Sequence, residues 1–413
     1  MRSHFEAGFF VGNRRRLRER VGDSAPIVVT ANGLLQRSAD TTMPFAQDRN
    51  FWYLTGLDKP DLVLVMTEAQ TYLILPPSNA VRDVFDGALD TAALSVRSGV
   101  SSVLSAREGQ AQLVADIRRA GRVHTLKPPT AYHRHYAFYA NPARQRLWRK
   151  LSRAVATTAI HDVRSEIAYL RARKQPAEIE AIKTAVAVTT EVIDELRQAD
   201  RLRQFTYEYA LEAALGAGFR ARGASGHAYT PIIASGPHAT TLHYVDNSGR
   251  LHAGELLVVD VGAEVECYAA DITRTLSLQP PSDRQQAVLD AVKDVQQAAA
   301  AFLQPGVDLK TYENYVATQM GRALVRLGLA TNPDDRAALR RYYPHATSHF
   351  LGLDVHDVGD YSAPLEPGMV LTCEPGIYIP EEGIGVRLED DLLVTKTGTQ
   401  NLSGDCAYDA YVL

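Results

Sequence analysis

Short apolar runs and helical stretches alternate along the first part of the chain. The runs at 25–30, 62–66 and 72–75 have the length and apolar content of buried strands. Helical patterns occupy residues 91–106 and 110–120. This alternation is typical of a mixed sheet with helices packed on it, so we expect an α/β domain.

A long helical pattern from 163 to 198 separates this part from the rest of the chain. Pro176 suits the first turn of a helix, where its missing N–H is no loss. An apolar stripe then follows at helical spacing, made of Ile179, Ile182, Ala185, Val186 and Val192. We place the boundary before this helix, which predicts an N-terminal domain of residues 1–165 and a second domain of residues 166–413.

The second domain mixes strands with helices, which predicts an α+β fold. The pattern predicts helices at 207–215, 284–303 and 309–327, and strands at 255–260, 269–276, 368–379 and 384–395. The strand at 269–276 is predicted to be the partner of the strand at 255–260.

Composition excludes some classes of function. A chain of 413 residues is too long for one ordinary domain. Its formal net charge of -4 and pI near 6.3 argue against nucleic acid as the main partner. It contains no stretch of 18 apolar residues, and its N-terminus lacks the apolar core of a signal peptide. We therefore expect no nucleic-acid partner and no membrane partner.

One basic run lies near the N-terminus, and it consists of Arg14, Arg15, Arg16, Arg18 and Arg20. Leu17 and Val21 supply apolar residues at positions i and i+4 of the same segment. We therefore predict that the run is the solvated face of an N-terminal helix.

The chain has three cysteines, Cys267, Cys373 and Cys406, which form no CxxC pair. An odd number without such a pair favours a reducing cytoplasm. Cys267 and Cys373 lie close in sequence to candidate metal ligands. We interpret these two as small buried packing residues, because oxygen donors dominate the candidate site.

Five residues of the metal-ligand type lie in apolar or glycine-bounded segments of the second domain: Asp260, Asp271, His349, Glu374 and Glu389. Two carboxylates about 4 Å apart repel by roughly 4 kcal/mol at an effective dielectric of 20. Four that converge on one point are therefore tolerable only if cations join them. Carboxylate oxygens with one imidazole suit two divalent ions such as Mn, Co or Zn. Two such ions make a hydrolytic centre that activates water.

The first two carboxylates are 11 residues apart. Asp260 ends an apolar run, and Gly262 allows a tight bend or a close backbone approach. The spacing to Asp271 fits two adjacent antiparallel strands that bring both carboxylates together. Taken alone, the pair also fits a salt bridge with Arg274.

The segment 343–359 carries three histidines among apolar residues. We assign His349 as a metal ligand, and we expect His345 and His356 to line the substrate cleft. A neutral imidazole can donate a hydrogen bond to a carbonyl or to a developing oxyanion.

The last two carboxylates each follow an apolar run near the C-terminus. Strand alternation puts Arg387 on the same face as Glu389. Arg387 can therefore orient the carboxylates or pair with a substrate carbonyl. His243 precedes the first ligand, and the residue alone leaves open whether it contacts substrate or a backbone group.

The motifs around these residues resemble those of the pita-bread metallopeptidases, which include aminopeptidase P, prolidase and methionine aminopeptidase. They read DVGAEVECYAADITRT, HATSHFLGLDVHDVG, LTCEPGIYI and GIGVRLEDD. The segment 37–56, RSADTTMPFAQDRNFWYLTG, is similar to the N-terminal domain of bacterial aminopeptidase P and disfavours methionine aminopeptidase. The resemblance covers nearly the whole chain and implies an α/β N-terminal domain followed by an α+β pita-bread domain.

The resemblance also implies a role for each site residue. Asp260, Asp271 and the bridging Glu389 would hold one metal, and Asp271, His349, Glu374 and Glu389 would hold the other. His243 and His356 would be proton carriers or stabilisers of the tetrahedral intermediate. His345 would bind substrate around the scissile bond, and Arg387 would lie behind the ligands. Mn is the expected metal, with Co, Zn or Fe as alternatives.

The implied reaction releases the N-terminal residue from a peptide with proline at the second position. In this hypothesis Glu374 accepts a proton from the attacking water and passes it to the proline nitrogen. One alternative is prolidase, which cleaves only Xaa-Pro dipeptides with the same ligand set. Another is a non-catalytic peptide-binding relative, although such relatives typically lose ligands and all five are present here.

Two segments depart from the family pattern. The loop between Tyr378 and Gly385 is short, and the segment 81–89 lacks a tryptophan that could cover a neighbour's active site. Both departures affect the expectations for the length of the substrate and for the geometry of the oligomer. Since family members commonly assemble through the N-terminal domain, a homodimer or homotetramer is expected.

Overall fold

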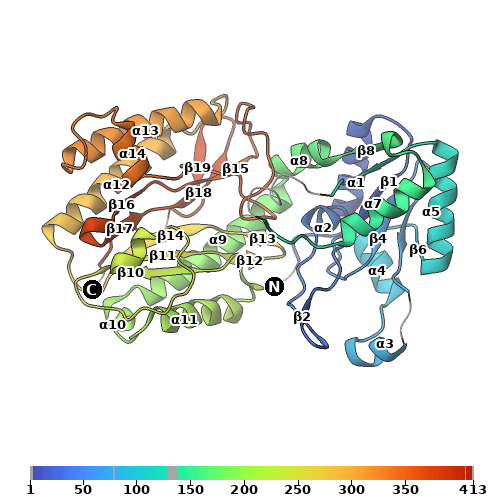
Figure 1. The fold of residues 1–413 in the computed structure, drawn as a ribbon, viewed down its shortest axis with the longest axis horizontal. Helices are drawn as coiled ribbons and strands as arrows, with labels where there is room; N and C mark the ends of the chain where they lie inside the picture. The colour runs from blue at the N-terminus through green and yellow to red at the C-terminus, as the bar shows by residue number, and fades with distance from the viewer. Residues whose placement is uncertain (1–2, 78–79, 129–136, 405, 412–413) are drawn as a thin grey trace. The chain divides into compact units, whose positions relative to one another are not determined.

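The computed structural model describes residues 3–77, 80–128, 137–404 and 406–411. It divides into two compact units (Figure 1). One contains Phe5–Leu170, and the other contains Arg171–Leu413 together with the N-terminal residues up to His4. The division falls within helix α8, which spans Arg164–Ala172.

The first unit is built on a six-stranded mixed sheet with the order β6-β5-β4-β1-β7-β8. The strands are β1 (Ile27–Thr30), β4 (Val63–Met66), β5 (Thr71–Ile74), β6 (Ser102–Leu104), β7 (Val123–Thr125) and β8 (Ile160–Asp162). The pairs β1–β4 and β4–β5 are antiparallel, whereas β1–β7, β5–β6 and β7–β8 are parallel. The three predicted strands and the α/β class are confirmed.

The other elements of this unit are the helices α1 (Ala7–Val21), α2 (Arg49–Thr55), α3 (Ala80–Asp86), α4 (Thr91–Ser98), α5 (Ala106–Ala120), α7 (Ala143–Ala154) and α8, the short helix η1 (Thr157–Ala159), and the hairpin of β2 (Gln36–Ser38) and β3 (Thr41–Thr42). Leu113 and Ile117 of α5 pack with Leu147 and Leu151 of α7 against the buried side chains of the sheet.

The predicted helix at 91–106 is wrong in its second half. Helix α4 ends at Gly99, which has a left-handed φ of 64° and caps the helix by donating its N–H to the carbonyl of Ser95. The following residues form β6, which pairs with β5. Glycine adopts this conformation without strain, so the helix stops there and the chain enters the sheet.

The basic run at 14–20 was predicted to be solvated, but the structure bears this out only in part. Arg14 is buried, and its guanidinium donates to the carbonyl oxygens of Leu54 and Gly99 at 2.7 and 3.0 Å. Burial lowers its pKa to about 10. Arg14 therefore ties α1 to the ends of α2 and α4, while Arg15 and Arg20 are exposed.

The second unit contains the helices α9 (Pro176–Leu196), α10 (Ala199–Leu202), α11 (Glu208–Ala221), α12 (Asp283–Phe302), α13 (Leu309–Arg326) and α14 (Arg336–Tyr342), and the short helices η2 (Gly236–Thr240) and η3 (Pro380–Glu382). Its first strands are β9 (Gly226–His227), β10 (Ile232–Ser235), β11 (Leu256–Val261), β12 (Ala263–Val265), β13 (Tyr268–Ala269) and β14 (Ile272–Ser277). Its last strands are β15 (Val370–Cys373), β16 (Gly376–Ile379), β17 (Ile384–Arg387), β18 (Asp390–Val394) and β19 (Thr399–Asn401).

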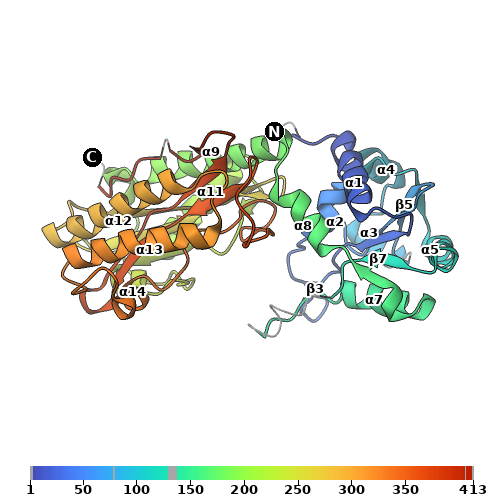
Figure 2. The same ribbon diagram turned by 90° about the horizontal axis from the view of Figure 1, so that it is seen from above.

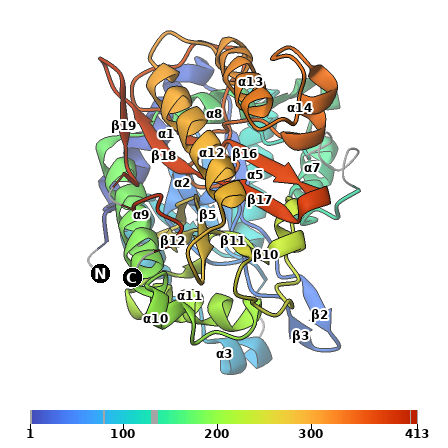
Figure 3. The ribbon, with the colours of Figure 1, turned by 90° about the vertical axis from the view of Figure 1, so that its left-hand side faces the viewer.

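These strands lie between two groups of helices. The sheets β10-β11-β14 and β13-β12-β9 pack against α9 and α11, and β15-β18-β19 and β16-β17 pack against α12. Figure 3 shows the strands between α9 and α11 on one side and α12, α13 and α14 on the other. Figure 2 shows α12 and α13 running side by side. This layering is the pita-bread arrangement, and it confirms the α+β prediction. Within the described ranges, no helix is long and apolar enough to cross a membrane.

Several predicted strands are shorter than expected, and the breaks fall at candidate ligands. The segment 368–379 divides into β15 and β16, with Glu374 and Pro375 between them. The segment 384–395 divides into β17 and β18 at Leu388 and Glu389. Pro375 has no N–H to give to a ladder, which explains the first break.

Gly262 gives a test of the packing around the first ligand strand. A Cβ at this position would lie 1.8 Å from the carbonyl oxygen of Ala270, a backbone atom that cannot easily move. Gly262→Ala should therefore lower stability by about 1–3 kcal/mol, the usual range for overpacking. Thermal unfolding of the purified variant measures this loss.

Gly12→Ala is the matched control, because a Cβ at Gly12 of α1 meets nothing within 4 Å. It should leave stability unchanged or raise it by about 0.5–1 kcal/mol. Equal unfolding temperatures for the two variants would contradict the account of Gly262.

Candidate metal centre

Two adjacent strands position the first two carboxylates. Asp260 lies in β11, opposite Thr273 of β14 in an antiparallel pair. Asp271 directly precedes β14, and both carboxylates are buried. The sequence prediction that antiparallel strands bring this pair together agrees with the observed register.

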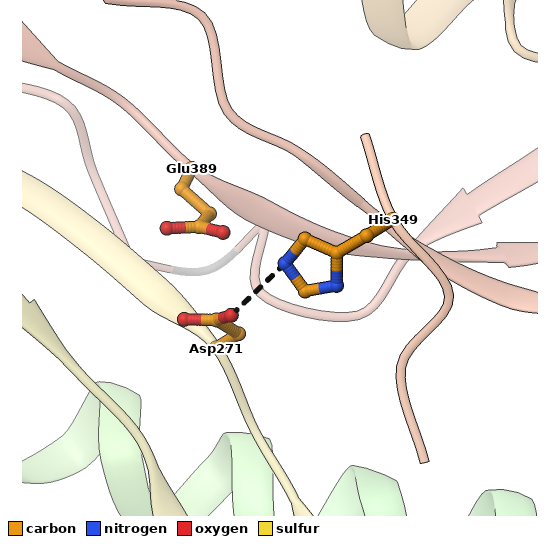
Figure 4. Close-up of side chains that lie close together, drawn as sticks. All are labelled: Asp271, His349 and Glu389. Atoms are coloured by element: carbon orange, nitrogen blue, oxygen red, sulfur yellow. Dashed lines mark ion pairs between the residues drawn. The ribbon is translucent and has the colours of Figure 1, made fainter. Parts of the chain in front are cut away.

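Asp271, His349 and Glu389 form the most compact group of candidate ligands. One ligand atom from each lies within 4.8 Å of the others, and Nε2 of His349 is 3.4 Å from Oδ2 of Asp271. Figure 4 shows the three side chains pointing toward one another from separate segments of the chain. Such spacing leaves room for a cation between the ligand atoms.

The two remaining ligand candidates lie beside this group. Oε1 of Glu374 is 3.5 Å from Nε2 of His349. Burial raises the pKa of Asp271, Glu374 and Glu389, and the negative charge of Asp260 adds to this effect, so Asp260 lies within electrostatic reach of all three. The structure thus brings together all five residues that the sequence singled out as metal ligands.

Hydrogen bonds fix the ring of His349 in an orientation suited to a ligand. Its Nδ1 lies 3.1 Å from the carbonyl oxygen of Phe350, which can only accept. The proton of a neutral ring therefore belongs on Nδ1, and the lone pair of Nε2 faces the carboxylates. Metal-binding histidines are commonly held in this way through the other ring nitrogen.

The surroundings of three of the carboxylates disfavour their ionised form and raise their pKa values. Burial raises the pKa of Glu374 to about 7, and the charge of Asp271 adds to this effect. Burial together with the charges of Asp271 and Glu374 raises the pKa of Glu389 well above its ordinary value. Burial opposes the charged form of His349, yet hydrogen bonding to Asp271 and the charge of Glu374 raise its pKa to about 9.

Burial and mutual repulsion therefore favour protonation of this cluster in the metal-free chain. Oxygen donors with one imidazole match divalent ions of the Mn, Co and Zn type. The residues present therefore fit two divalent ions, which would neutralise the buried negative charge.

The three other predicted histidines surround the ligands. The rings of His349 and His356 lie 4.2 Å apart between centroids. His345 places Nδ1 3.9 Å from Oε2 of Glu374. His243 is exposed in a turn after η2, and η2 packs on β17, the strand that ends with Arg387. All three predicted cleft histidines thus lie near the candidate centre.

Burial lowers the pKa of both His345 and His356 to about 4, so both are neutral near pH 7. His345 has partners for both ring nitrogens. Nδ1 is 2.8 Å from the carbonyl oxygen of Ala346, and Nε2 is 2.9 Å from the hydroxyl of Tyr378.

Arg387 lies behind the ligands, as predicted. Its guanidinium donates to Oδ2 of Asp260 at 2.5 Å and to the hydroxyl of Tyr378 at 3.0 Å. It is almost fully buried, so its charge acts at short range on the carboxylates. Arg387 and Tyr378 therefore connect Asp260 to His345 through direct hydrogen bonds.

Three further residues that hold the ligands escaped the sequence analysis. Tyr229 donates its hydroxyl to Oδ1 of Asp260 at 2.6 Å, and Thr273 donates to Oε2 of Glu389 at 2.6 Å. Asp391 accepts the backbone N–H of Asp271 at 3.1 Å. Thr273 could have been found, because it shares a strand face with Asp271, whereas Tyr229 carries no signal in its own segment.

The cysteines agree only in part with their prediction. All three are free thiols. Cys373 is buried and its sulfur accepts a hydrogen bond from the hydroxyl of Tyr312 at 3.4 Å, as expected of a packing residue. Cys267 is half-exposed in a turn with a φ of 70°, so its predicted burial is wrong. Turn formation between β12 and β13 places it there.

Metal removal should make stability depend on pH. Glu374 has a pKa raised from 4.5 to about 7, and His349 has one raised from 6.5 to about 9. Both groups therefore stabilise the metal-free fold at low pH, and this contribution is lost as pH rises through about 7 and then about 9. The gap in unfolding temperature between Mn-loaded and EDTA-treated protein should widen from pH 5.5 to pH 9.

Glu374→Gln serves as the internal control for this titration, since it removes the group with the pKa of about 7. The widening between pH 5.5 and 7.5 should become smaller in this variant. A gap that stays constant across the whole range in the unsubstituted protein would contradict the proton-for-metal exchange.

Comparison with known proteins agrees with this geometry. Residues 180–396 match the model for metallopeptidase family M24, and residues 10–124 match that for the aminopeptidase P N-terminal domain. Xaa-Pro aminopeptidase 3 of Rattus norvegicus is 34% identical over 93% of this chain and 79% of its own length. Xaa-Pro aminopeptidase of Escherichia coli strain K12 is 33% identical over 95% of this chain and 94% of its own length.

Solved structures show the same relationship. Escherichia coli aminopeptidase P with the inhibitor Pro-Leu has a TM-score of 0.86 at 30% identity, and the match covers 98% of this chain and 97% of that chain. The zinc-substituted form of that enzyme in complex with product has a TM-score of 0.87 at the same identity and coverage. The chain therefore belongs to metallopeptidase family M24, carries the aminopeptidase P N-terminal domain, and is a metallo-exopeptidase.

Proposed function

We propose that this protein is an Xaa-Pro aminopeptidase, which releases the N-terminal residue from peptides with proline at the second position. The observation that carries the proposal is the convergence of three buried carboxylates, the half-buried Glu374 and one histidine on a single centre. The similar proteins named as Xaa-Pro aminopeptidases support the choice of proline-containing substrates.

The ligand set divides between two divalent ions, of which Mn is our first choice and Co, Zn or Fe the alternatives. Asp260, Asp271 and Glu389 would hold one ion, and Asp271, His349, Glu374 and Glu389 would hold the other. When bound, two such ions supply Lewis acidity, which lowers the pKa of a water molecule from 15.7 to about 7 and polarises a carbonyl. The hydrogen bonds to Asp260, Glu389 and His349 keep their ligand atoms aimed at the centre.

Glu374 is the residue we assign to proton transfer. Its carboxylate lies at the candidate centre, 3.5 Å from Nε2 of His349, where it can accept a proton from a water molecule held there and release it again. In the proposed reaction it takes a proton from the attacking water and delivers it to the proline nitrogen as the peptide bond breaks. Proton delivery is required because the nitrogen of an amide is a poor leaving group unless it is protonated.

His345 and His356 act as neutral groups in this proposal. His243 and His356 would carry protons or donate hydrogen bonds to the oxygen of the tetrahedral intermediate. His345 would form the wall around the scissile bond, held in place by Tyr378. Arg387 would keep Asp260 ionised and oriented through their direct contact.

Prolidase and a non-catalytic binding protein are the two competing functions. Prolidase would need a group that captures the free carboxylate of a dipeptide. The named relatives favour the aminopeptidase over the prolidase. The presence of all five ligands at one centre disfavours the non-catalytic alternative.

Three further features belong to the proposal. The domain boundary near residue 165 would place the catalytic domain at 166–413. Three free cysteines support a cytoplasmic location. Assembly as a homodimer or homotetramer is expected from the family, and sedimentation velocity would measure it.

Substrate length separates the two peptidase functions. The Mn-loaded protein should hydrolyse an Xaa-Pro-Xaa tripeptide with a higher kcat/KM than the matching Xaa-Pro dipeptide. EDTA should abolish both activities, because the carboxylates cannot act without the ions. Preference for the dipeptide would identify a prolidase, and turnover that persists in EDTA would contradict a metal-dependent mechanism.

Replacement of the proton carrier tests the mechanism more directly. Glu374→Gln should lower kcat by at least about 100-fold, the lower range for a general acid–base group. Single-turnover and steady-state kinetics on the tripeptide measure the loss. Glu195→Gln removes a half-exposed surface carboxylate and should retain full turnover. Full activity of the Glu374→Gln variant would contradict the assignment of Glu374 to proton transfer.

A further inference from the structure

One of the buried carboxylates outside the metal centre, Glu208, has no part in the mechanism above. Glu208 is the first residue of α11 and is fully buried. Its two oxygens accept hydrogen bonds from five donors. Burial opposes its charge, yet the hydrogen bonds outweigh burial and lower its pKa. A buried, ionised carboxylate with this many donors is a rigid anchor point.

The five donors come from a single stretch of chain. Oε1 accepts from the backbone N–H of Ser235 at 2.8 Å, from its hydroxyl at 2.7 Å and from Nδ1 of His238 at 3.0 Å. Oε2 accepts from the hydroxyl of Tyr244 at 2.8 Å and from the N–H of Gly249 at 2.6 Å. We call residues 236–249 the His243 segment. Glu208 binds Ser235 directly before this segment, His238 and Tyr244 within it, and Gly249 at its end.

His243 lies in a turn between two of the residues that Glu208 binds. The ring of His238 stacks on that of Tyr244, with centroids 4.3 Å apart and planes 21° apart. The turn that carries His243 lies between these two residues and is closed by the bond from the N–H of Tyr244 to the carbonyl of Thr241. Since Glu208 binds both His238 and Tyr244, it fixes the two ends of this turn.

The same segment is attached to the metal-binding strand. Ser235 ends β10, which pairs with β11, and Ile232 lies opposite Asp260 in that pair. The segment begins with η2, which packs on β17, the strand that ends with Arg387. Glu208 thus lies at the junction between a strand that holds a ligand and a loop that presents a histidine.

A second contact one turn along α11 supports the same segment. Nδ2 of Asn247 donates to Glu212 at 2.8 Å and to the carbonyl of Pro231 at 3.0 Å. Oδ1 of Asn247 accepts the N–H of Ile233 at 2.9 Å. Glu208 and Glu212 are four residues apart, so one face of the helix holds the segment.

We infer that Glu208 is a positioning residue for the peptidase reaction, which holds the His243 segment so that His243 faces the substrate beside His345 and His356. It acts through His243 and does not touch the metal centre itself. This inference rests on the proposed function, because His243 has a role only if a peptide binds in the cleft.

The charged form of the side chain is required for this role. Glutamine has the same shape, but it offers one acceptor oxygen and an NH₂ group where five donors converge. At least one of the five donors would then face the NH₂ group of the glutamine. A buried donor without a partner is costly. Glu208→Gln should therefore loosen the His243 segment without altering the ligands.

The test is a double-mutant cycle on the tripeptide with Mn-loaded protein. Glu208→Gln should lower kcat/KM by about 10- to 100-fold, as misplacement of a catalytic group can do, and mainly through kcat. In the His243→Ala background the same substitution should change kcat/KM by less than about twofold, since coupled residues are not additive. An equal loss in both backgrounds, or a loss of Mn affinity, would overturn the inference.

Hydrogen exchange supplies a readout that is independent of activity. Peptides covering residues 235–249 should exchange faster in Glu208→Gln, because glutamine keeps one oxygen and the N–H of either Ser235 or Gly249 loses its acceptor, while β11 and β14 keep their protection. Unchanged exchange in 235–249 would contradict the anchor. If the unsubstituted protein cleaves no Xaa-Pro peptide, the proposed function fails, whereas this measurement still decides whether Glu208 holds the segment.

Two more variants complete the design. Tyr244→Phe removes one donor and leaves the carboxylate, so it should produce a smaller effect in the same direction if Glu208→Gln does not fold. Glu191→Gln removes an exposed carboxylate of α9 that pairs with Arg222, and it should match the unsubstituted protein in both measurements. A loss in Glu191→Gln as large as in Glu208→Gln would show that the effect is not specific to the anchor.

Discussion

Repulsion among buried carboxylates is the constraint around which the catalytic unit is built. Asp260, Asp271, Glu374 and Glu389 approach one another in a part of the fold with little solvent, and burial raises the pKa of three of them. Such a site is stable with protons, as in the metal-free chain, or with cations. The proposed function follows from the second state, because cations held there would activate water beside Glu374.

The fold satisfies this constraint by interrupting its strands. Glu374 and Glu389 lie in breaks between strands, and Asp271 directly precedes β14, so the backbone can turn each carboxylate toward the centre. Neighbouring strands then supply the groups that hold the ligands. Thr273 reaches Glu389 and Arg387 reaches Asp260. Away from the centre, Glu208 orders the loop that carries His243 by the same means, a buried charge surrounded by donors.

Most of the fold class and all five ligand candidates could be predicted from the sequence. Apolar runs ending in a carboxylate signal a buried charge that needs a partner, and this signal is local. Contacts between distant segments carry no such signal, so the burial of Arg14 against the carbonyls of Leu54 and Gly99 was missed. Tyr229 and Glu208 escaped for the same reason. The breaks in the strands were missed because the apolar pattern continues through them, and only tertiary packing decides where a ladder ends.

Calorimetric titration of the metal-stripped protein with Mn, repeated at pH 7 in buffers of different ionisation enthalpy, tests the central claim most directly. Because His349 and Glu374 hold protons in the metal-free site, we predict that two ions bind per chain and that binding releases protons to the buffer. Binding of fewer than two ions, or binding heats that do not depend on the buffer, would contradict the account of a carboxylate cluster held together by cations.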